Sequence, residues 1–347
     1  MRKITFVLGS LSRGGAERVI SVLANDYAEK GWQVDIILLL SNKIGYDLNA
    51  SIRVLDFTGK YESRVKRLPY WLKELRLFFK KQKPEICLAF AARINILVQL
   101  ATMGLKLKTY VSERNDPKLD GRGPLVRILT CLLYPHASGV IFQTKRAASN
   151  FPKLKNAVII PNPIQVNDSR KEVTRGKIVY VGRLSPQKNP LLLLKAFAVN
   201  APKHPEYYIE MYGDGELMDS LKKAVDELGI VDRVHFAGNV KDIHKRIADA
   251  SFFVLPSDYE GLSNALLEAM VMGIPCISTN CAGADEYIVN GENGLLTEVG
   301  NLNQMSSAMD QFMTNDELRK QCGENAKQTW NLVSKDIVLS RWHSLMD

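Results

Sequence analysis

A short apolar run, a glycine-bearing loop and a helix follow one another between residues 251 and 275, and this stretch constrains the fold most. The run Ser251–Leu255 is typical of a buried parallel strand. Residues 265–272 are mostly strong helix formers, Ser263 suits the N-cap, and Gly273 ends the helix. This order builds a doubly wound parallel sheet, and the N–H groups at such a helix start favour phosphate.

Two acidic residues flank this turn. Glu260 lies in the loop, whereas Glu268 lies in the second turn of the helix, on the same face as Asn264. The two carboxylates are not helix neighbours, so we expect different roles for them. The spacing alone fits a ligand site and, equally well, a capping role for Glu260 with a surface position for Glu268.

The same order opens both halves of the chain. In the first half, the strand Ile4–Leu8 leads into a loop that ends in Gly14 and Gly15, and a helix is expected over Ala16–Lys30. The loop lacks the G-x-G-x-x-G spacing of dinucleotide sites, but its glycines permit close approach of the backbone to a ligand.

The second half restarts with the strand Lys177–Val181. The loop after it carries Arg183 and Lys188, and two cations at the carboxyl end of a parallel strand are the placement expected of a diphosphate site. The polar, aperiodic run Gln165–Gly176 predicts a linker before it. We therefore expect two α/β domains.

Charge is divided unevenly between the halves. Residues 1–160 carry 27 Lys+Arg and 12 Asp+Glu, a net +15, whereas residues 161–347 carry 19 and 25, a net −6. The basic half is expected to face an anionic partner, although no recognised nucleic-acid motif accompanies it. The five cysteines and five histidines lack metal-ligand spacing, which indicates reduced cytoplasmic thiols and no metal site.

The most basic segment is Lys60–Lys83. Between Trp71 and Phe79, apolar residues recur at helical spacing among lysines and arginines, which predicts a basic amphipathic helix. Such a helix binds an anionic membrane surface, gaining about 1 kcal/mol per basic residue, or it packs its apolar stripe on the core while its lysines face water. Periodicity favours neither alternative.

A polar segment, Ser112–Pro117, follows the predicted strand Leu107–Val111 and contains Glu113 and Arg114. Ligands bind at the carboxyl ends of parallel strands, so these side chains are candidates for a site. A polar turn without a ligand explains the segment at least as well.

Several segments together resemble one enzyme family. They are Gly14–Arg18, Val181–Leu184 with Lys188, Gly213–Gly215, Glu260–Met270 and Asn290–Leu296. In this order they resemble glycosyltransferase family 4, whose members are retaining enzymes with the GT-B fold; the E-x(7)-E pattern after a strand is the most specific part. Within the family the chain is most similar to bacterial exopolysaccharide, capsule and O-antigen enzymes of the amylovoran-transferase type, a likeness that Ser112–Asn115 shares.

The resemblance implies two Rossmann-like domains that face each other across a cleft. Residues 1–165 would form the acceptor-side domain and residues 166–330 the nucleotide-sugar domain. Residues 331–347 would form a helix that packs back on the first domain.

The resemblance also implies roles for individual residues. Arg183 and Lys188 would neutralise the donor diphosphate, and Glu260 would orient the donor sugar, so these three form the expected catalytic set. Glu268 would accept hydrogen bonds from the ribose hydroxyls. The remaining expected donor-site residues are Leu262, Ser263 and Asn264, through their N–H groups, and Gly15. Those on the acceptor side are Gly14, Glu113 and Arg114.

The resemblance predicts a hexosyltransferase that moves a sugar from a nucleotide-sugar, with UDP-sugar the expected donor, to a lipid-linked or saccharide acceptor in bacterial surface polysaccharide synthesis. No metal or other cofactor is expected. The enzyme would be cytoplasmic and peripheral on the inner membrane face. One alternative is a sugar-nucleotide epimerase of the same fold, which donor turnover without an acceptor would favour. The other is a non-catalytic sugar-nucleotide-binding scaffold, which a Glu260→Ala variant with full transfer activity would favour.

Overall fold

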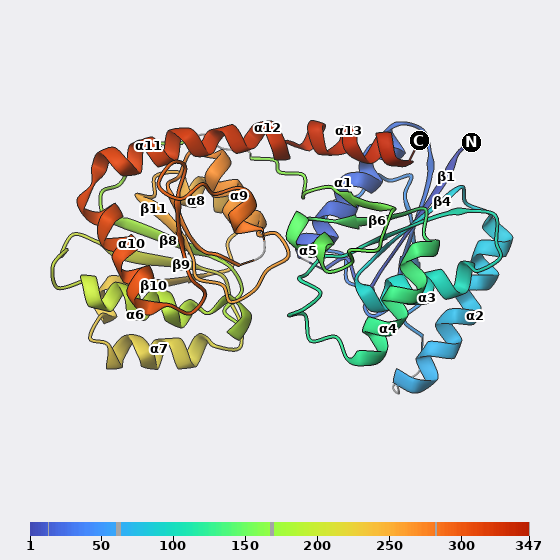
Figure 1. The fold of residues 1–347 in the computed structure, drawn as a ribbon, viewed down its shortest axis with the longest axis horizontal. Helices are drawn as coiled ribbons and strands as arrows, with labels where there is room; N and C mark the ends of the chain where they lie inside the picture. The colour runs from blue at the N-terminus through green and yellow to red at the C-terminus, as the bar shows by residue number, and fades with distance from the viewer. Residues whose placement is uncertain (13, 60–63, 167–169, 282, 347) are drawn as a thin grey trace. The chain divides into compact units, whose positions relative to one another are not determined.

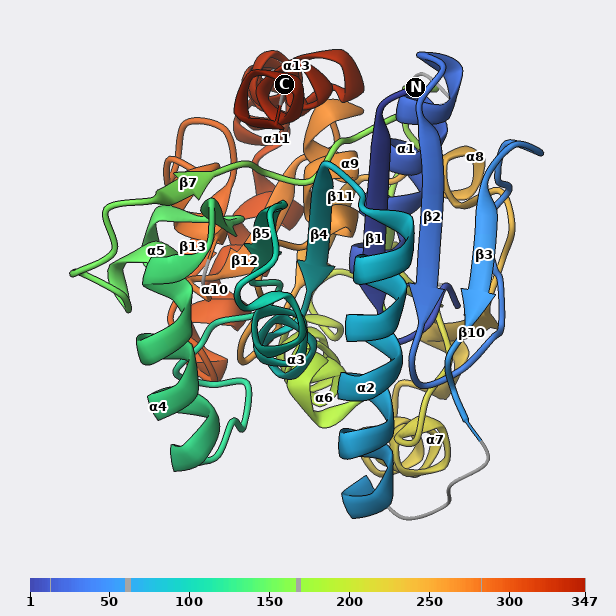
Figure 2. The same cartoon turned by 90° about the vertical axis from the view of Figure 1, so that its right-hand side faces the viewer.

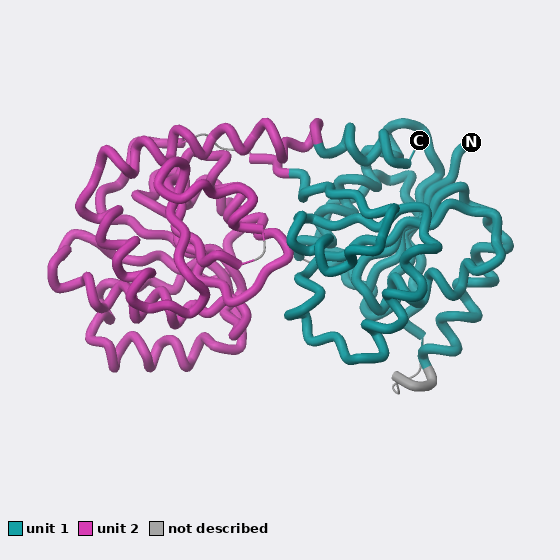
Figure 3. Tube along the Cα trace, viewed as in Figure 1, with its two compact units in different colours: residues 1–163, 338–347 teal, residues 164–337 magenta. Residues whose placement is uncertain are grey.

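The structure is a computed structural model that describes residues 1–12, 14–59, 64–166, 170–281 and 283–346. The chain forms two compact units (Figure 3). Unit 1 comprises residues 1–163 and 338–347, and unit 2 comprises residues 164–337.

Unit 1 is built on a β-sheet with helices packed around it (Figure 1). The sheet has seven strands in the order β3-β2-β1-β4-β5-β6-β7, and every neighbouring pair is parallel. The strands are β1 (Lys3–Leu8), β2 (Gln33–Leu38), β3 (Arg53–Asp56), β4 (Ile86–Phe90), β5 (Lys108–Ser112), β6 (Gly139–Phe142) and β7 (Ala157–Ile159). The helices are α1 (Gly15–Glu29), α2 (Arg64–Gln82), α3 (Ala92–Thr102), α4 (Pro124–Leu133), α5 (Lys145–Ser149) and most of α13 (Lys335–Met346).

Helices cover both faces of this sheet, because successive residues of a strand point to opposite sides. In β1, Phe6 and Leu8 pack with α1 and α13, whereas Val7 packs with α2 and α3. Figure 2 shows α2, α3 and α4 side by side on the second face. Strand order reverses between β1 and β4, so their carboxyl ends form the switch point of unit 1.

Unit 2 repeats the plan with six parallel strands in the order β10-β9-β8-β11-β12-β13. The strands are β8 (Lys177–Val181), β9 (Tyr208–Tyr212), β10 (Val234–Gly238), β11 (Phe252–Leu255), β12 (Cys276–Thr279) and β13 (Leu295–Thr297). The helices are α6 (Pro190–Asn200), α7 (Met218–Glu227), α8 (Ile243–Ile247), α9 (Asn264–Val271), α10 (Leu302–Thr314), α11 (Asp316–Ala326) and α12 (Trp330–Val333). Its switch point lies between β8 and β11.

The boundaries of the two compact units differ from those of the predicted domains by a few residues. The first boundary lies at residues 163 and 164, two residues before the predicted one. The predicted C-terminal helix is two helices, because Ser334 between α12 and α13 has an extended backbone. The chain returns to unit 1 at Val338, and Trp342 is fully buried in the core of that unit.

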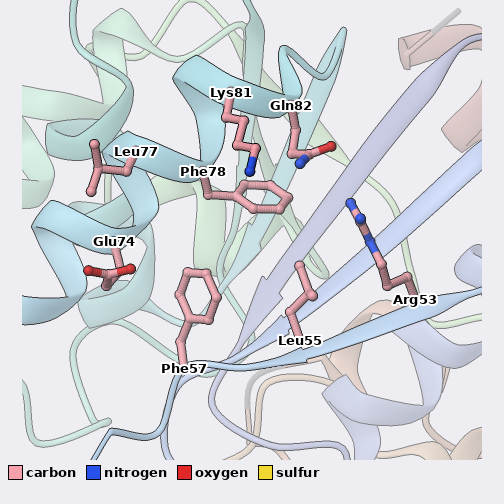
Figure 4. Close-up of a pocket in the computed structure, with 8 residues that line it drawn as sticks. All are labelled: Arg53, Leu55, Phe57, Glu74, Leu77, Phe78, Lys81 and Gln82. Carbon is pink, nitrogen blue, oxygen red and sulfur yellow. The ribbon is translucent and has the colours of Figure 1, made fainter.

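The apolar stripe of the predicted basic helix packs against the core of unit 1. Residues 60–63 of this prediction lie outside the described residues, and α2 begins at residue 64. Leu75 and Phe79 are buried, and Phe78 faces β3 across a hollow of about 270 Å³ (Figure 4). Lys73 and Lys80 face water. Among the described residues, no helix combines the length and the apolar character needed to cross a membrane.

Candidate active site

Two loops meet at the switch point of unit 2. The first, residues 182–189, follows β8, and the second, residues 256–263, follows β11, the neighbouring strand. Parallel strands bring their carboxyl ends to one edge, so loops that are separated by about seventy residues lie in contact. This edge is where an open α/β sheet binds its ligand.

Lys188 and Glu260 form an ion pair between these loops. The Lys188 ammonium donates to Glu260 Oε1, and Ser257 Oγ donates to the same oxygen at 2.8 Å. The side chains of the pair are 19% and 8% exposed. A partly desolvated ion pair of this kind is held in one geometry, because each charge would be costly to leave unpaired.

Three further hydrogen bonds join the two loops. Asp258 N donates to the Gln187 carbonyl at 2.9 Å, and Gln187 Nε2 donates to the Tyr259 carbonyl at 3.0 Å. Asn189 has a left-handed backbone, with φ +42°, and its Nδ2 donates to Asp258 Oδ1 at 2.8 Å. Asn189 Oδ1 also caps α6. The loops are therefore one rigid assembly.

A glycine at the end of β9 supports the first loop from below. Gly213 has φ +135°, and a Cβ there would lie 2.0 Å from the Gly182 carbonyl oxygen. The Gly182 N–H in turn donates to the Tyr212 carbonyl at 2.9 Å. Only a residue without a side chain permits this backbone approach.

Arg183 is the exposed cation of the site. Its carbonyl accepts a hydrogen bond from the Tyr180 hydroxyl at 2.9 Å, which fixes the backbone. Burial and the Glu260 charge raise the pKa of Tyr180, so this donor keeps its proton. No carboxylate among the described residues forms an ion pair with the Arg183 guanidinium, so it is available to an anionic ligand.

Helix α9 begins at the same edge. Ser263 is its N-cap and accepts from Leu266 N, as predicted. Leu262 is buried in a cluster with Leu267 and Val333 and anchors the turn. Asn264 is the first residue of α9, so the helix start lies directly after the loop that carries Glu260.

Glu268 is buried on α9 and faces a histidine. Its Oε2 lies 3.2 Å from His244 Nε2 on α8. The spacing of the histidines in the sequence gives none of them a role, and only the fold brings His244, which follows β10, to the same edge as Glu268. His244 is therefore a residue of the site region that the sequence did not indicate.

In unit 1, Gly14 and Gly15 lie at the carboxyl end of β1. Gly14 is the N-cap of α1 without a side-chain cap, and Gly15 is the first helical residue. The Tyr46 hydroxyl accepts from Gly14 N at 3.0 Å and donates to Gly14 O at 2.7 Å. Tyr46 therefore fixes the backbone at the start of α1.

Glu113 belongs to a buried network at the carboxyl end of β5. Arg122 donates to both of its oxygens, at 3.1 and 2.6 Å, and the Tyr134 hydroxyl donates to Oε1. Burial would lower the pKa of Arg122, but its hydrogen bonds to Asp120 and Glu113 outweigh burial and raise it. Burial and the Glu113 charge raise the pKa of Tyr134. This network fixes the loop, and neither Arg122 nor Tyr134 was a candidate from sequence.

Arg114, the next residue, is held differently. Its guanidinium carbon lies 4.2 Å from the centre of the Phe90 ring and 5.9 Å from that of Trp342, and Nη1 donates to Asn162 Oδ1 at 3.1 Å. Nε and Nη2 are buried without a hydrogen-bond partner among the described residues. Burial lowers the pKa of Arg114 to about 9. This is a buried cation with spare donors.

The described residues contain no group of three or more His, Cys, Asp or Glu side chains that could hold a metal ion. In unit 2, the edge carries two cations, Arg183 and Lys188, and carboxylates that include Glu260 and Glu268. Cations beside a helix start suit a phosphate-bearing ligand, and carboxylates suit its hydroxyl groups.

Two doubly wound units with such a site define an enzyme of the GT-B class, and comparison with known proteins agrees. Residues 162–329 match the family described as "Glycosyl transferases group 1". The solved structure of Anabaena HepE in complex with UDP has a TM-score of 0.83 at 17% identity and covers 99% of both chains. The fold is therefore the predicted GT-B fold.

Two relatives match along most of their length. The chain is 27% identical to a Campylobacter jejuni N-acetylgalactosaminyltransferase named for a diphospho-undecaprenol-linked acceptor, over 100% of this chain and 98% of the relative. It is 27% identical to the lipopolysaccharide core biosynthesis glycosyltransferase LpsE of Rhizobium meliloti, over 91% and 90%. Residues 162–329 carry the group 1 signature, and the chain is a glycosyltransferase.

Proposed function

We propose that this glycosyltransferase moves a sugar from a UDP-sugar to a lipid-linked or saccharide acceptor in the synthesis of a bacterial surface polysaccharide. The observation that carries the proposal is the Lys188–Glu260 pair beside the exposed Arg183, at the switch point of unit 2. The UDP in the Anabaena structure supports the nucleotide, and the names of the Campylobacter and Rhizobium relatives support the acceptor and the pathway.

Each donor group has a partner in the site. The diphosphate meets Arg183 and Lys188 and the N–H groups of Leu262, Ser263 and Asn264 at the start of α9. Carboxylates accept hydrogen bonds from hydroxyl groups, so Glu260 orients the sugar and Glu268 holds the ribose. Gly15, at the start of α1 in unit 1, permits close approach of a ligand to the backbone because it has no side chain.

The transfer retains the configuration at the anomeric carbon and needs no metal. The bond from the anomeric carbon to the UDP oxygen breaks, and a bond to the acceptor hydroxyl oxygen forms on the same face of the sugar. The acceptor proton passes to the leaving phosphate. Arg183 and Lys188 stabilise the negative charge that develops on that phosphate, which is the role a metal has in other transferases.

The acceptor binds at unit 1, where Gly14, Glu113 and Arg114 lie at the carboxyl ends of β1 and β5. The net +15 of residues 1–160 and the exposed lysines of α2 favour an anionic acceptor and attract an anionic membrane surface. We place the enzyme on the cytoplasmic side, at the inner membrane face.

The test is a thermal-shift panel of nucleotides and nucleotide-sugars, followed by UDP release with membrane extract as acceptor source. A selective UDP-sugar is expected to raise the melting temperature, because a ligand that binds only the folded state stabilises it. Release without acceptor would favour an epimerase or hydrolase. If no UDP-sugar raised the melting temperature or released UDP, the proposed function would be wrong.

A further inference from the structure

Helix α4 of unit 1 presents an apolar stripe to solvent. Leu125, Ile128 and Leu132 are 66%, 56% and 61% exposed, and their spacing of three and four residues places them on one face of the helix. The opposite face, with Thr130 and Leu133, is buried against the unit. A contiguous exposed stripe of this kind marks an interaction surface, whereas scattered exposed apolar residues do not.

Basic residues border this stripe. Helix α4 contains no Asp or Glu, and its one charged residue is the exposed Arg127. Lys118, in the loop before α4, is exposed as well. The acidic residues of that loop are buried or bound by Arg122; they are Glu113, Asp116 and Asp120. The surface is therefore apolar at its centre and cationic at its margin.

We propose that the exposed stripe of α4 inserts into the boundary between headgroups and acyl chains of an anionic bilayer, with Arg127 and Lys118 at the level of the lipid phosphates. This proposal deepens the proposed function and rests on it, because a lipid-linked acceptor brings the enzyme to that surface. Helix α4 starts from the carboxyl edge of the sheet, where Glu113 and Arg114 lie, so insertion here holds an acceptor headgroup near that edge.

The shape of the stripe favours a bilayer over a second copy of the chain. Stable protein interfaces bury roughly 800 Å² on each partner, which three side chains on one three-turn helix do not supply. Helix α2 lies on the same face of the sheet (Figure 2) and exposes Lys73 and Lys80. These lysines add electrostatic attraction, while α4 supplies the apolar contact that the stripe of α2 does not.

Cys131 makes this surface directly measurable. It lies on α4 and is the one exposed cysteine; the other four are buried. Burial raises the pKa of each of those four thiols, so a fluorescent NBD reagent attaches selectively at Cys131. On the full chain, NBD emission is expected to shift to the blue with phosphatidylglycerol-containing vesicles, and doxyl-labelled lipids are expected to quench it.

A matched pair of variants, measured by vesicle flotation, tests the stripe itself. The triple variant Leu125→Ser/Ile128→Ser/Leu132→Ser is expected to bind anionic vesicles at least about tenfold more weakly than the parent. The control Val199→Ser/Val231→Ser, which changes exposed residues of unit 2, is expected to bind like the parent. Both are expected to melt at the parent temperature and to keep UDP release with a soluble saccharide acceptor.

The outcomes separate this proposal from the proposed function. Vesicle binding by the triple variant that equals the parent's, or NBD emission unchanged by vesicles, would overturn the role of α4 whatever the enzyme transfers. A parent dimer in light scattering that the triple variant dissociates would assign the stripe to a second copy and overturn it too. Absence of UDP release in the parent bears on the proposed function alone.

Discussion

Lys188 and Glu260 are ion-paired across two loops, with Glu260 Oε1 accepting from both the Lys188 ammonium and Ser257 Oγ. The cation that is proposed to meet the leaving phosphate is thus bound to the carboxylate that is proposed to meet the sugar. A phosphate at Lys188 competes with Glu260 for the same ammonium. Loss of either side chain should therefore change how strongly the other binds its part of the donor. Variants at the two positions measure these effects one at a time.

Glu260→Gln removes the charge but keeps the size of the side chain. We expect transfer to fall by about a hundredfold or more, because the donor sugar loses its orienting carboxylate. The affinity for UDP itself should be kept or raised, since Lys188 is released to bind phosphate. Turnover and UDP calorimetry measure the two effects. Asp258→Asn, on the same loop but bonded to Asn189, is the control, and full activity in Glu260→Gln would contradict the assignment.

Substitutions of Arg183 and Lys188 are expected to differ in how much they lower the free energy of unfolding. Arg183→Ala removes an exposed cation, so the free energy of unfolding should change by less than about 0.5 kcal/mol while UDP binding weakens at least about tenfold. Lys188→Ala leaves Glu260 buried without its cation and should destabilise unit 2 by about 3 kcal/mol. Denaturant unfolding with and without UDP compares them. If Lys188→Ala destabilised the protein no more than Arg183→Ala does, the Lys188–Glu260 pair would not be a structural contact.

The sequence indicates the local parts of this site but not their pairing. Apolar runs and helix formers locate β11 and α9, and Ser263 is the N-cap as predicted, because these features depend on neighbours within a few residues. The Lys188–Glu260 contact and the approach of His244 to Glu268 depend on strand order, which periodicity does not report. The two halves of the chain, by contrast, are evident from the repeated order of elements.

Unit 1 shows the same limit at its surface. The spacing of apolar residues in α2 predicts an amphipathic helix correctly, but it does not say whether the core or a membrane covers the stripe. In α4 apolar residues lie on both faces, so the pattern looks like that of a buried helix and gives no sign of an exposed stripe. Likewise, Arg122 and Tyr134 reach Glu113 only through the fold.

Gly213→Ala tests the support beneath the Arg183 loop. The added methyl group would overlap the Gly182 carbonyl, so the loop must shift, and we expect a loss of about 3 kcal/mol in stability together with weaker UDP binding. Gly238→Ala is the control, because its backbone also has positive φ but a Cβ there meets nothing within 4 Å. That control should cost only about 1 kcal/mol and leave UDP binding unchanged. Similar losses in both variants would show that φ alone matters.

Arg114→Leu should be more stable than the parent but less active. The buried guanidinium has no carboxylate partner among the residues that the structure describes, and its pKa is lowered to about 9, below that of the unfolded chain. Below pH 9 it is charged in both states, so its desolvation penalty is present in full, and the variant should gain about 1 kcal/mol between about pH 6 and 8. A loss of transfer with unchanged UDP affinity would place Arg114 on the acceptor side. A less stable variant would show that the ring contacts outweigh the penalty.

Glu268→Gln tests the ribose contact separately from the phosphate contacts. If Glu268 accepts hydrogen bonds from the ribose, the parent should bind UDP more tightly than 2′,3′-dideoxy-UDP by about tenfold, and the variant should lose most of that difference. Because His244 lies 3.2 Å from Glu268, His244→Ala should release the carboxylate and reduce the discrimination less than Glu268→Gln does. Calorimetry of both nucleotides with the parent and each variant closes a thermodynamic cycle in which the substitution and the loss of the ribose hydroxyls are the two changes. Discrimination that stays unchanged in Glu268→Gln would leave that carboxylate with His244 alone and assign the ribose to another group.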